Sequence, residues 1–311
     1  MKNKVIVIVG PTGVGKTETS IKVAKTFDGE IVSADSMQIY KKMDIGTAKI
    51  TKDEMQNVPH HMIDILDIDK TFSAAAYKEM ASKIIDDIIK RGKTPIVAGG
   101  TGLYVDSLFL DYEFGASFKD EKIRKKYEKI AAEKGNEYLH TLLENVDKKS
   151  AEKIHFNNVK RVIRALEINE ICGKTVDEVN AEKEKTERKE KYSPIMVGLT
   201  RDREILYERI NKRVDLMLEK GLVDEVKSLY AGDKKFSETS LSGIGYKEVI
   251  YYLKGLVTYD EMVRILKKET RHYAKRQLTW FNRNKDIKWF NLENNTSCDV
   301  LDYIKTKMEE F

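Results

Sequence analysis

The sequence predicts an α/β fold in which a parallel sheet core is flanked by helices and interrupted by an all-helical insertion. Apolar, strand-like runs alternate with helix-like segments at the start of the chain, and such a run returns near residue 193. The residues in between are rich in Lys and Glu and show no strong strand pattern. We expect residues 1–112 and 193–311 to form the core, and residues 113–192 to form the insertion.

The first element is the apolar run 5–9, which precedes a glycine-rich segment and a helix-like stretch over 18–26. The segment has the pattern G-x-x-x-x-G-K-[ST] in a strand–loop–helix context, which predicts a P-loop NTPase-like core. Its backbone N–H groups and the following helix dipole favour a phosphate group. We therefore expect a di- or triphosphate to bind residues Gly10, Pro11, Thr12, Gly13, Val14, Gly15, Lys16 and Thr17. Lys16 would supply a charge, and Thr17 would hold Mg²⁺.

The next elements are a strand over 29–35, an amphipathic helix over 73–91 and a strand over 94–98. In the helix, the apolar residues near helical spacing are Ala76, Met80, Ile84, Ile85 and Ile88. Asp35 ends its strand, so we expect it at the sheet edge that also carries Lys16. A carboxylate there could accept a proton, although capping of the next turn is the alternative.

At the end of the expected insertion, residues 181–191 form a run of mixed-sign charges, which is typical of a solvated helix face or a linker. A strand is expected over 193–199, and a long helical region from Arg203. Near the C-terminus, one helical stripe carries Arg264, Lys268, Arg271 and Lys275, and the opposite side carries Leu266, Tyr273, Gln277 and Trp280. The basic stripe could follow a phosphate backbone, or it is an ordinary lysine-rich surface; the aromatic residues favour a core position.

The composition favours a soluble protein of a reducing compartment. Hydrophobic residues make up 41% of the chain and the formal net charge is +5. No apolar stretch approaches the ~20 residues that span a bilayer, so we expect no membrane association. Cys172 and Cys298 are far apart in sequence, which argues against a disulfide framework or a zinc site and favours the cytoplasm.

The motifs favour group transfer over the mechanical use of ATP. Motor and switch NTPases carry an apolar strand that ends in Asp, whereas the strand over 94–98 opens into Gly99-Gly100-Thr101-Gly102. Small-molecule kinases also combine a phosphate loop, an Asp and a glycine pair. A second basic cluster, Lys160-Arg161-Val162-Ile163-Arg164, has no evident use in such a kinase.

Taken together, these motifs resemble the tRNA dimethylallyltransferase family, also called tRNA isopentenyltransferases. Besides the phosphate loop, the matching stretches are 33–40 (SADSMQIY), 43–49 (MDIGTAK), 59–64 (PHHMID), 99–104 (GGTGLY), 164–167 (RALE), 243–248 (GIGYKE) and 270–280 (TRHYAKRQLTW). They follow the order of the family and extend from near residue 4 to about residue 290.

The resemblance implies transfer of a dimethylallyl group from dimethylallyl diphosphate to N6 of the adenosine 3′-adjacent to the anticodon, in tRNAs that read codons beginning with U. It implies Mg²⁺ as cofactor, release of diphosphate, the anticodon stem-loop as partner and a monomer in the cytoplasm. By the same resemblance, Asp35 is the base, and Thr101, Lys16 and Arg213 assist at the reacting centre. The residues expected to contact tRNA are Asp35, Ser36, Met37, Gln38, Thr101, Arg124, Lys160, Arg161 and Arg164, with Arg271, Lys275 and Arg276 added from the C-terminal basic helix.

Three alternatives differ in what they leave unexplained. An adenylate isopentenyltransferase shares the phosphate loop and the base but has less need of the insertion and the basic C-terminal helix. A small-molecule P-loop kinase would turn over ATP and leave the motifs after residue 105 without a role. A non-catalytic RNA-binding module would need neither the complete phosphate loop nor Asp35.

Overall fold

The computed structural model describes residues 3–109, 120–185, 191–232 and 235–310. The chain divides into two compact units, one formed by Met1–Phe109 with Glu190–Phe311 and the other by Leu110–Lys189. The boundary expected at residues 112 and 113 lies outside the described residues.

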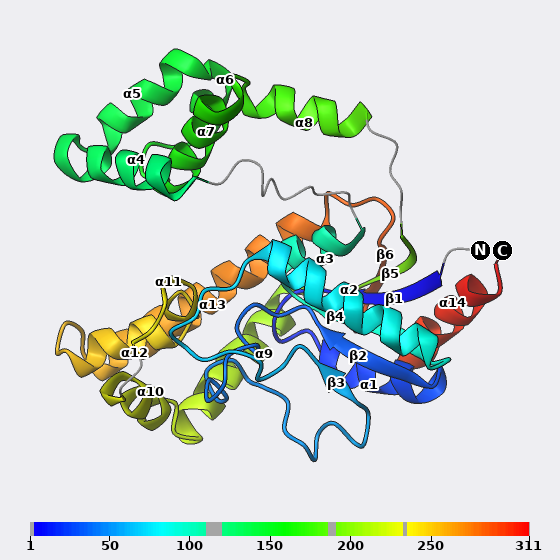
Figure 1. Cartoon of the computed structure of the whole chain (residues 1–311). Coiled ribbons are helices and arrows are strands. Elements are labelled where there is room, and N and C mark those ends of the chain that lie inside the picture. The colour runs from blue at the N-terminus through cyan, green and yellow to red at the C-terminus, as the bar shows by residue number, and fades with distance from the viewer. Residues whose placement is uncertain (1–2, 110–119, 186–190, 233–234, 311) are drawn as a thin grey trace. The chain divides into compact units, whose positions relative to one another are not determined.

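The first unit is built on a six-stranded sheet with the order β3-β2-β4-β1-β5-β6 (Figure 1). All neighbouring strands are parallel, which confirms the predicted α/β core. The strands are β1 (Asn3–Val9), β2 (Gly29–Ser33), β3 (His60–His61), β4 (Thr94–Gly99), β5 (Tyr192–Thr200) and β6 (Lys288–Asn291). The side chains of 5–9 in β1 are fully buried because helices cover both faces of a parallel sheet.

The helices of this unit surround the sheet and extend beyond its carboxyl edge. They are α1 (Lys16–Thr26), α2 (Ala74–Lys90), α3 (Gly102–Phe109), α9 (Arg203–Glu219), α10 (Leu222–Ala231), α11 (Glu238–Leu241), α12 (Tyr246–Leu253), α13 (Tyr259–Phe281) and α14 (Ser297–Glu309). One apolar cluster joins the sheet to α1 and α14. A second cluster packs the segment after β2 against α9, α10, α12 and α13, through residues such as Tyr40, Met43 and Leu222. Two members of this second cluster, Tyr246 and Leu266, also line a cavity.

The buried face of α2 differs from the prediction. The residues that the structure buries are Ala74, Tyr77, Ala81, Ile85 and Ile88, so only the last two were expected correctly. Met80 is 38% exposed. The reason is the tyrosine: the Tyr77 ring stacks on the Tyr104 ring of α3 at 4.2 Å, which turns the Tyr77 side of the helix inward.

The second unit is helical throughout its described part. It contains α4 (Glu121–Lys134), α5 (Asn136–Val146), α6 (Lys148–Lys153), α7 (Val159–Cys172) and α8 (Val176–Lys185). Its core joins α4, α5 and α7 through residues such as Tyr127, Leu139 and Leu166. Of the charge run over 181–191, residues 181–185 end α8, and 186–190 lie outside the described residues. Among the described helices, none combines the length and the apolar character needed to cross a bilayer.

Candidate active site

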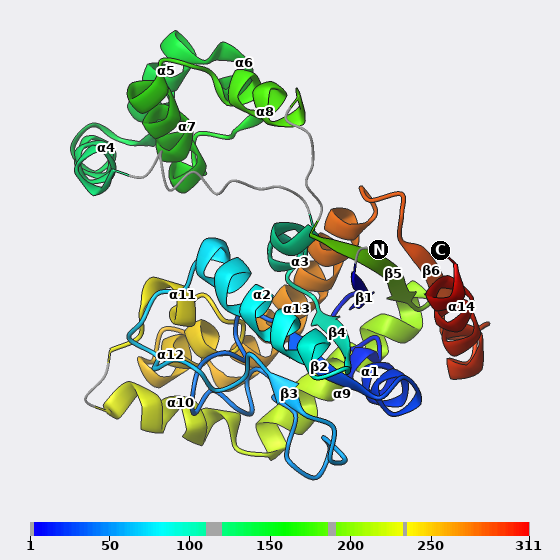
Figure 2. The same ribbon diagram turned by 45° about the vertical axis from the view of Figure 1, so that its right-hand side comes forward.

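A cavity of about 610 Å³ opens at the carboxyl edge of the sheet. Its wall combines the loop between β1 and α1, the turn after β2 and the segment 46–48 with side chains from α9, α12 and α13. The helices α9 and α13 lie side by side across this end of the sheet (Figure 2). The cavity is thus lined by segments that are far apart in the sequence.

Residues 10–15 of the phosphate-binding motif form the loop between β1 and α1, and Lys16 and Thr17 are the first two residues of α1. Gly13 and Gly15 have φ of 80° and 114°, which glycine adopts without the strain that a Cβ would bring. The Lys16 Nζ donates to the carbonyl oxygens of Gly10 and Pro11, both at 2.9 Å. Burial lowers the pKa of Lys16 to about 8, and the nearby Asp35 charge opposes that shift. The Lys16 ammonium is therefore held against the loop carbonyls at the border of the cavity.

Gln277 of α13 holds this loop in place. Its Oε1 accepts the Thr12 N–H at 2.8 Å, and its Nε2 donates to the Gly100 carbonyl at 3.0 Å. Only 5% of Gln277 is exposed. A Cβ on Gly100 would lie 2.0 Å from the Gln277 Nε2, so this contact requires glycine. Gln277 thus joins the loops that follow β1 and β4, whereas sequence analysis placed it only on one side of a helix.

Two arginines outside the motif also bind the loop. The Arg209 Nε donates to the Gly13 carbonyl at 3.0 Å, and the Arg201 Nε donates to the Val14 carbonyl at 2.9 Å. Sequence reasoning missed both residues. The spacing of Arg209 and Arg213, four residues apart on α9, was the available signal, because such residues share a helix face.

Asp35 lies two residues beyond β2, in the turn that leads away from the sheet. Its Oδ1 accepts the N–H groups of Met37 at 2.9 Å and Gln38 at 3.3 Å, so it caps this turn, as the alternative interpretation expected. The Thr101 Oγ1 accepts the Ser36 N–H at 3.0 Å, which brings the loop after β4 against the same turn. Asp35 also lines the cavity together with Lys16. The two hydrogen bonds of the capped turn therefore hold Asp35 in place, and its carboxylate borders the same cavity as the phosphate-binding loop.

Arg213 and Tyr273 complete the polar wall of the cavity. Burial lowers the pKa of Arg213, and the Asp35 charge opposes this. Burial likewise raises the pKa of Tyr273, with a further contribution from the Asp35 charge, while hydrogen bonds to Thr101 and Gln277 oppose the rise. Two cations and a carboxylate thus interact in a largely buried space, an arrangement typical of functional sites.

Comparison with known proteins agrees with this geometry. The family model described as IPP transferase matches residues 38–284, more than half of the chain. The chain belongs to this family. A tRNA dimethylallyltransferase of Alkaliphilus metalliredigens is 48% identical over 311 residues, covering 100% of this chain and 99% of the relative.

Two solved structures of the family have the same architecture. The tRNA isopentenylpyrophosphate transferase of Bacillus halodurans is 43% identical, with a TM-score of 0.75, and the match covers 99% of this chain and 97% of that one. A eukaryotic dimethylallyltransferase acting on tRNA is 31% identical, with a TM-score of 0.81, over 98% of this chain and 80% of its own. The family expected from the motifs is therefore confirmed, and with it the expectation of a tRNA prenyltransferase.

The residues expected to contact tRNA fall into two groups in this IPP transferase chain. In the first unit, the cavity is lined by Asp35, Ser36, Met37, Gln38 and Arg276, and Thr101 contacts Ser36. Lys275 is exposed on α13. The Arg271 Nη1 donates to Asn211 Oδ1 at 2.6 Å, which ties its guanidinium to α9.

In the second unit, Lys160, Arg161 and Arg164 lie on α7 and Arg124 lies on α4. The fully buried Glu167 accepts hydrogen bonds from the Arg124 Nε at 2.9 Å and from the Arg164 Nη1 at 2.6 Å. Both arginines thus stabilise the helical unit. Contact with tRNA stays a prediction for all four residues.

The residues present fit a magnesium ion of the kind expected for this family. Thr17 is exposed at the start of α1, and Thr17 and Asp35 both line the cavity. Within the described parts of the chain, no group of three or more His, Cys, Asp or Glu side chains could hold a metal. Mg²⁺ binds with few protein ligands when substrate phosphate and water complete its octahedral shell. Thr17 suits that mode of binding.

Proposed function

We propose that this chain transfers a dimethylallyl group from dimethylallyl diphosphate to N6 of the adenosine 3′-adjacent to the anticodon, in tRNAs that read codons beginning with U. The observation that carries the proposal is that the phosphate-binding loop and the Asp35 turn border one cavity. A leaving diphosphate and an attacking nucleophile can therefore be bound together, which converts a bimolecular reaction into an oriented one.

The diphosphate end of the donor binds residues 10–17. The N–H groups of the loop, the Lys16 ammonium and the Arg213 guanidinium meet the negative charge that grows on the leaving oxygen. Thr17 would hold Mg²⁺, which when bound supplies further positive charge to the leaving group. The bond between C1 of the prenyl group and the diphosphate oxygen breaks, and its electron pair leaves with the diphosphate.

The adenosine end lies at the turn after β2. As the bond from N6 to C1 of the prenyl group forms, Asp35 takes a proton from N6. The Gln38 amide offers both a donor and an acceptor, which is the pattern that an adenine edge requires. Ser36 and Met37 line the same wall, and Thr101 supports it through the Ser36 N–H.

The tRNA would contact the basic residues of both units. Arg271, Lys275 and Arg276 follow α13, and Arg124, Lys160, Arg161 and Arg164 belong to the helical unit of residues 110–189, which we assign to the anticodon stem-loop. An extruded base is the only form in which a buried donor can reach N6 of a nucleotide in a folded loop. We place the enzyme in the cytoplasm as a monomer.

A transfer assay tests the function. Protein, Mg²⁺ and labelled dimethylallyl diphosphate are offered an anticodon stem-loop, the same loop without the target adenosine, or AMP. Label in the first acceptor alone supports the proposal. Label in AMP would favour an adenylate isopentenyltransferase, and steady phosphate release from ATP would favour a kinase.

Asp35→Asn is the decisive variant. It retains the shape of the side chain but removes the base, so transfer should fall by about 10²–10⁴ while stem-loop affinity is kept. Asp53→Asn, at an exposed position, is the matched control and should leave transfer unchanged. Equal activity of Asp35→Asn and the control would refute the role of Asp35 as base.

A further inference from the structure

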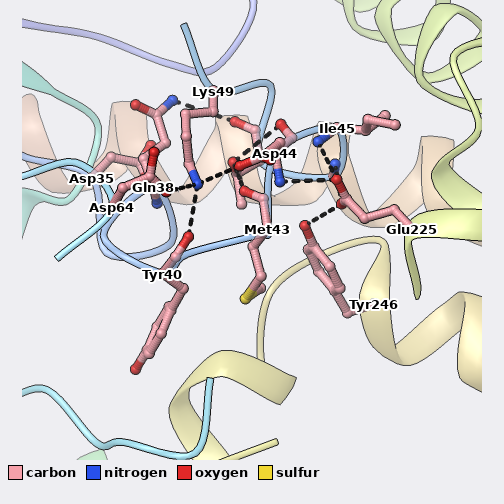
Figure 3. A network of polar contacts seen from close by, with 12 residues as sticks. Asp35, Gln38, Tyr40, Met43, Asp44, Ile45, Lys49, Asp64, Glu225 and Tyr246 are labelled. Atoms are coloured by element: carbon pink, nitrogen blue, oxygen red, sulfur yellow. Dashed lines mark hydrogen bonds and ion pairs between the residues drawn. The ribbon is translucent and has the colours of Figure 1, made fainter. Parts of the chain in front are cut away.

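The segment 43–49, which we name the acceptor loop, lines the cavity with Gly46, Thr47 and Ala48. Figure 3 shows Asp44 and Lys49 of this segment together with Gln38. It contributes one carbonyl to the site: the Gln38 Nε2 donates to the Thr47 oxygen at 3.3 Å. The position of this carbonyl therefore bears directly on how the Gln38 amide is turned.

Glu225 of α10 holds one side of the acceptor loop (Figure 3). Its Oε2 accepts the N–H groups of Asp44 at 2.9 Å and Ile45 at 2.7 Å, and its Oε1 accepts the Gly46 N–H at 3.1 Å. The Tyr246 hydroxyl donates to the same Oε1 at 2.7 Å. Hydrogen bonds to an ionised acceptor are stronger than neutral ones, so four donors on one carboxylate fix this bend firmly.

Lys49 holds the other side of the loop. Its Nζ donates to the Tyr40 carbonyl at 2.7 Å and to the Asp44 carboxylate at 2.6 Å, and it also pairs with Asp64. The Lys49 side chain is 5% exposed, although the two carboxylates reach solvent. Ala48 lies between Lys49 and the residues bound by Glu225 and has a left-handed φ of 45°. A residue other than glycine rarely adopts this conformation unless its neighbours enforce it.

A fixed Thr47 carbonyl leaves the Gln38 amide one favourable orientation. With Nε2 toward Thr47, one N–H is used there, and Oε1 with the second N–H remains for a base. The reversed amide would set Oε1 against the Thr47 oxygen, two acceptors without a hydrogen between them.

Amide orientation decides which purine is accepted. On its Watson–Crick edge, adenine presents a donor at N6 beside the acceptor N1, whereas a 6-oxopurine presents an acceptor at O6 beside the donor N1–H. An amide held in one orientation matches the first pattern and opposes the second, whereas an amide free to turn would match both.

We propose that Glu225 and Lys49 are positioning residues that act through the acceptor loop to fix the Gln38 amide, and so select adenine over a 6-oxopurine as the base in the cavity. This inference rests on the proposed function, in which Gln38 contacts the target adenosine. Neither residue touches the reacting atoms; both act through the Thr47 carbonyl.

The test measures the dissociation constants of two anticodon stem-loops, one with adenosine and one with inosine at the target position. Wild type should prefer adenosine about tenfold to a hundredfold. Glu225→Gln and Lys49→Met should reduce that preference to less than about threefold, because the amide can then turn. Asp224→Asn, at an exposed neighbouring position on α10, is the matched control and should keep the wild-type preference. Diphosphate affinity should be the same in all four proteins.

A second set of variants separates positioning from general damage. In a Gln38→Ala background, Glu225→Gln should change the preference no further, since both act on one amide. If Glu225→Gln fails to fold, Tyr246→Phe removes a single donor to Glu225 and should lower the preference part of the way. Equal losses of affinity for both loops, or additive effects with Gln38→Ala, would overturn the inference. Wild-type transfer to the adenosine loop is measured alongside: its absence with the preference intact would refute the proposed reaction and leave the amide mechanism standing.

Discussion

Gln277→Met tests how strongly one buried amide organises the site. Methionine has a similar length and volume but cannot donate or accept the two hydrogen bonds that Gln277 makes to Thr12 and Gly100. Thr12 lines the cavity, where water can replace the lost acceptor, so loss of its hydrogen bond to Gln277 should cost about 1 kcal/mol. The Gly100 carbonyl is buried, and leaving it without a donor should cost about 2 kcal/mol. We therefore expect the free energy of unfolding to fall by about 3 kcal/mol.

The assay monitors urea unfolding by far-UV circular dichroism. The change in the urea midpoint is multiplied by the slope m to give the change in the free energy of unfolding. Lys268→Met, at an exposed position of the same helix, is the matched control and should stay within about 0.5 kcal/mol of wild type. Diphosphate affinity should also weaken in Gln277→Met, because the phosphate-binding loop loses the hydrogen bond that holds it to α13. A variant as stable as the control, with unchanged diphosphate affinity, would show that the loop needs no clamp and would refute the reasoning.

Three further predictions concern charges elsewhere. Hydrogen bonds from Arg91 lower the pKa of Glu30 to about 2, so its stabilisation is present above its usual pKa and is lost as the pH falls. Glu30→Gln should therefore lower the free energy of unfolding by about 2–3 kcal/mol at pH 7, and that difference should halve by about pH 3; a constant difference would contradict the linkage. Glu167→Gln should destabilise the helical unit by about 3 kcal/mol, because two arginines lose their buried partner, and faster hydrogen exchange in α4 and α7 would report it. Lys275→Ala should lower the slope of log affinity against log salt for the stem-loop by about 1 without changing diphosphate affinity; an equal slope would place the tRNA contact away from α13.

Much of the core could be predicted from the sequence because its signals are local. The phosphate-binding motif consists of eight adjacent residues that follow an apolar run, and the structure places six of them between β1 and α1 and the last two at the start of α1. The alternation of strands and helices predicted a parallel sheet for the same reason. The face of α2 was predicted less well, because Tyr77 was not counted among the residues that point inward, whereas its ring packs on α3.

The supports of the site could not be predicted, since they join residues distant in sequence. The Glu225 carboxylate binds backbone N–H groups about 180 positions earlier, and nothing in the sequence near either partner signals the pair. Gln277 was placed on the helix side that also carries Tyr273 and Trp280, but its partners, Thr12 and Gly100, belong to other loops. Nearly every residue has the same backbone N–H and C=O groups, so the sequence does not indicate which of them a side chain will bind.

The position of β5 has a consequence for how the chain folds during synthesis. β1 lies at the middle of the finished sheet, but its partner on one side, β5, begins at Tyr192. At ribosomal rates of about 5–20 residues per second, synthesis of the chain between β1 and β5 takes roughly 10 to 40 s, and one edge of β1 stays unpaired during that time. An apolar strand with an unpaired edge is a target for association with other chains, so this interval exposes the nascent protein to aggregation. The helical unit encoded in between has mainly local contacts and can fold first, which leaves the sheet to be closed late by the returning chain.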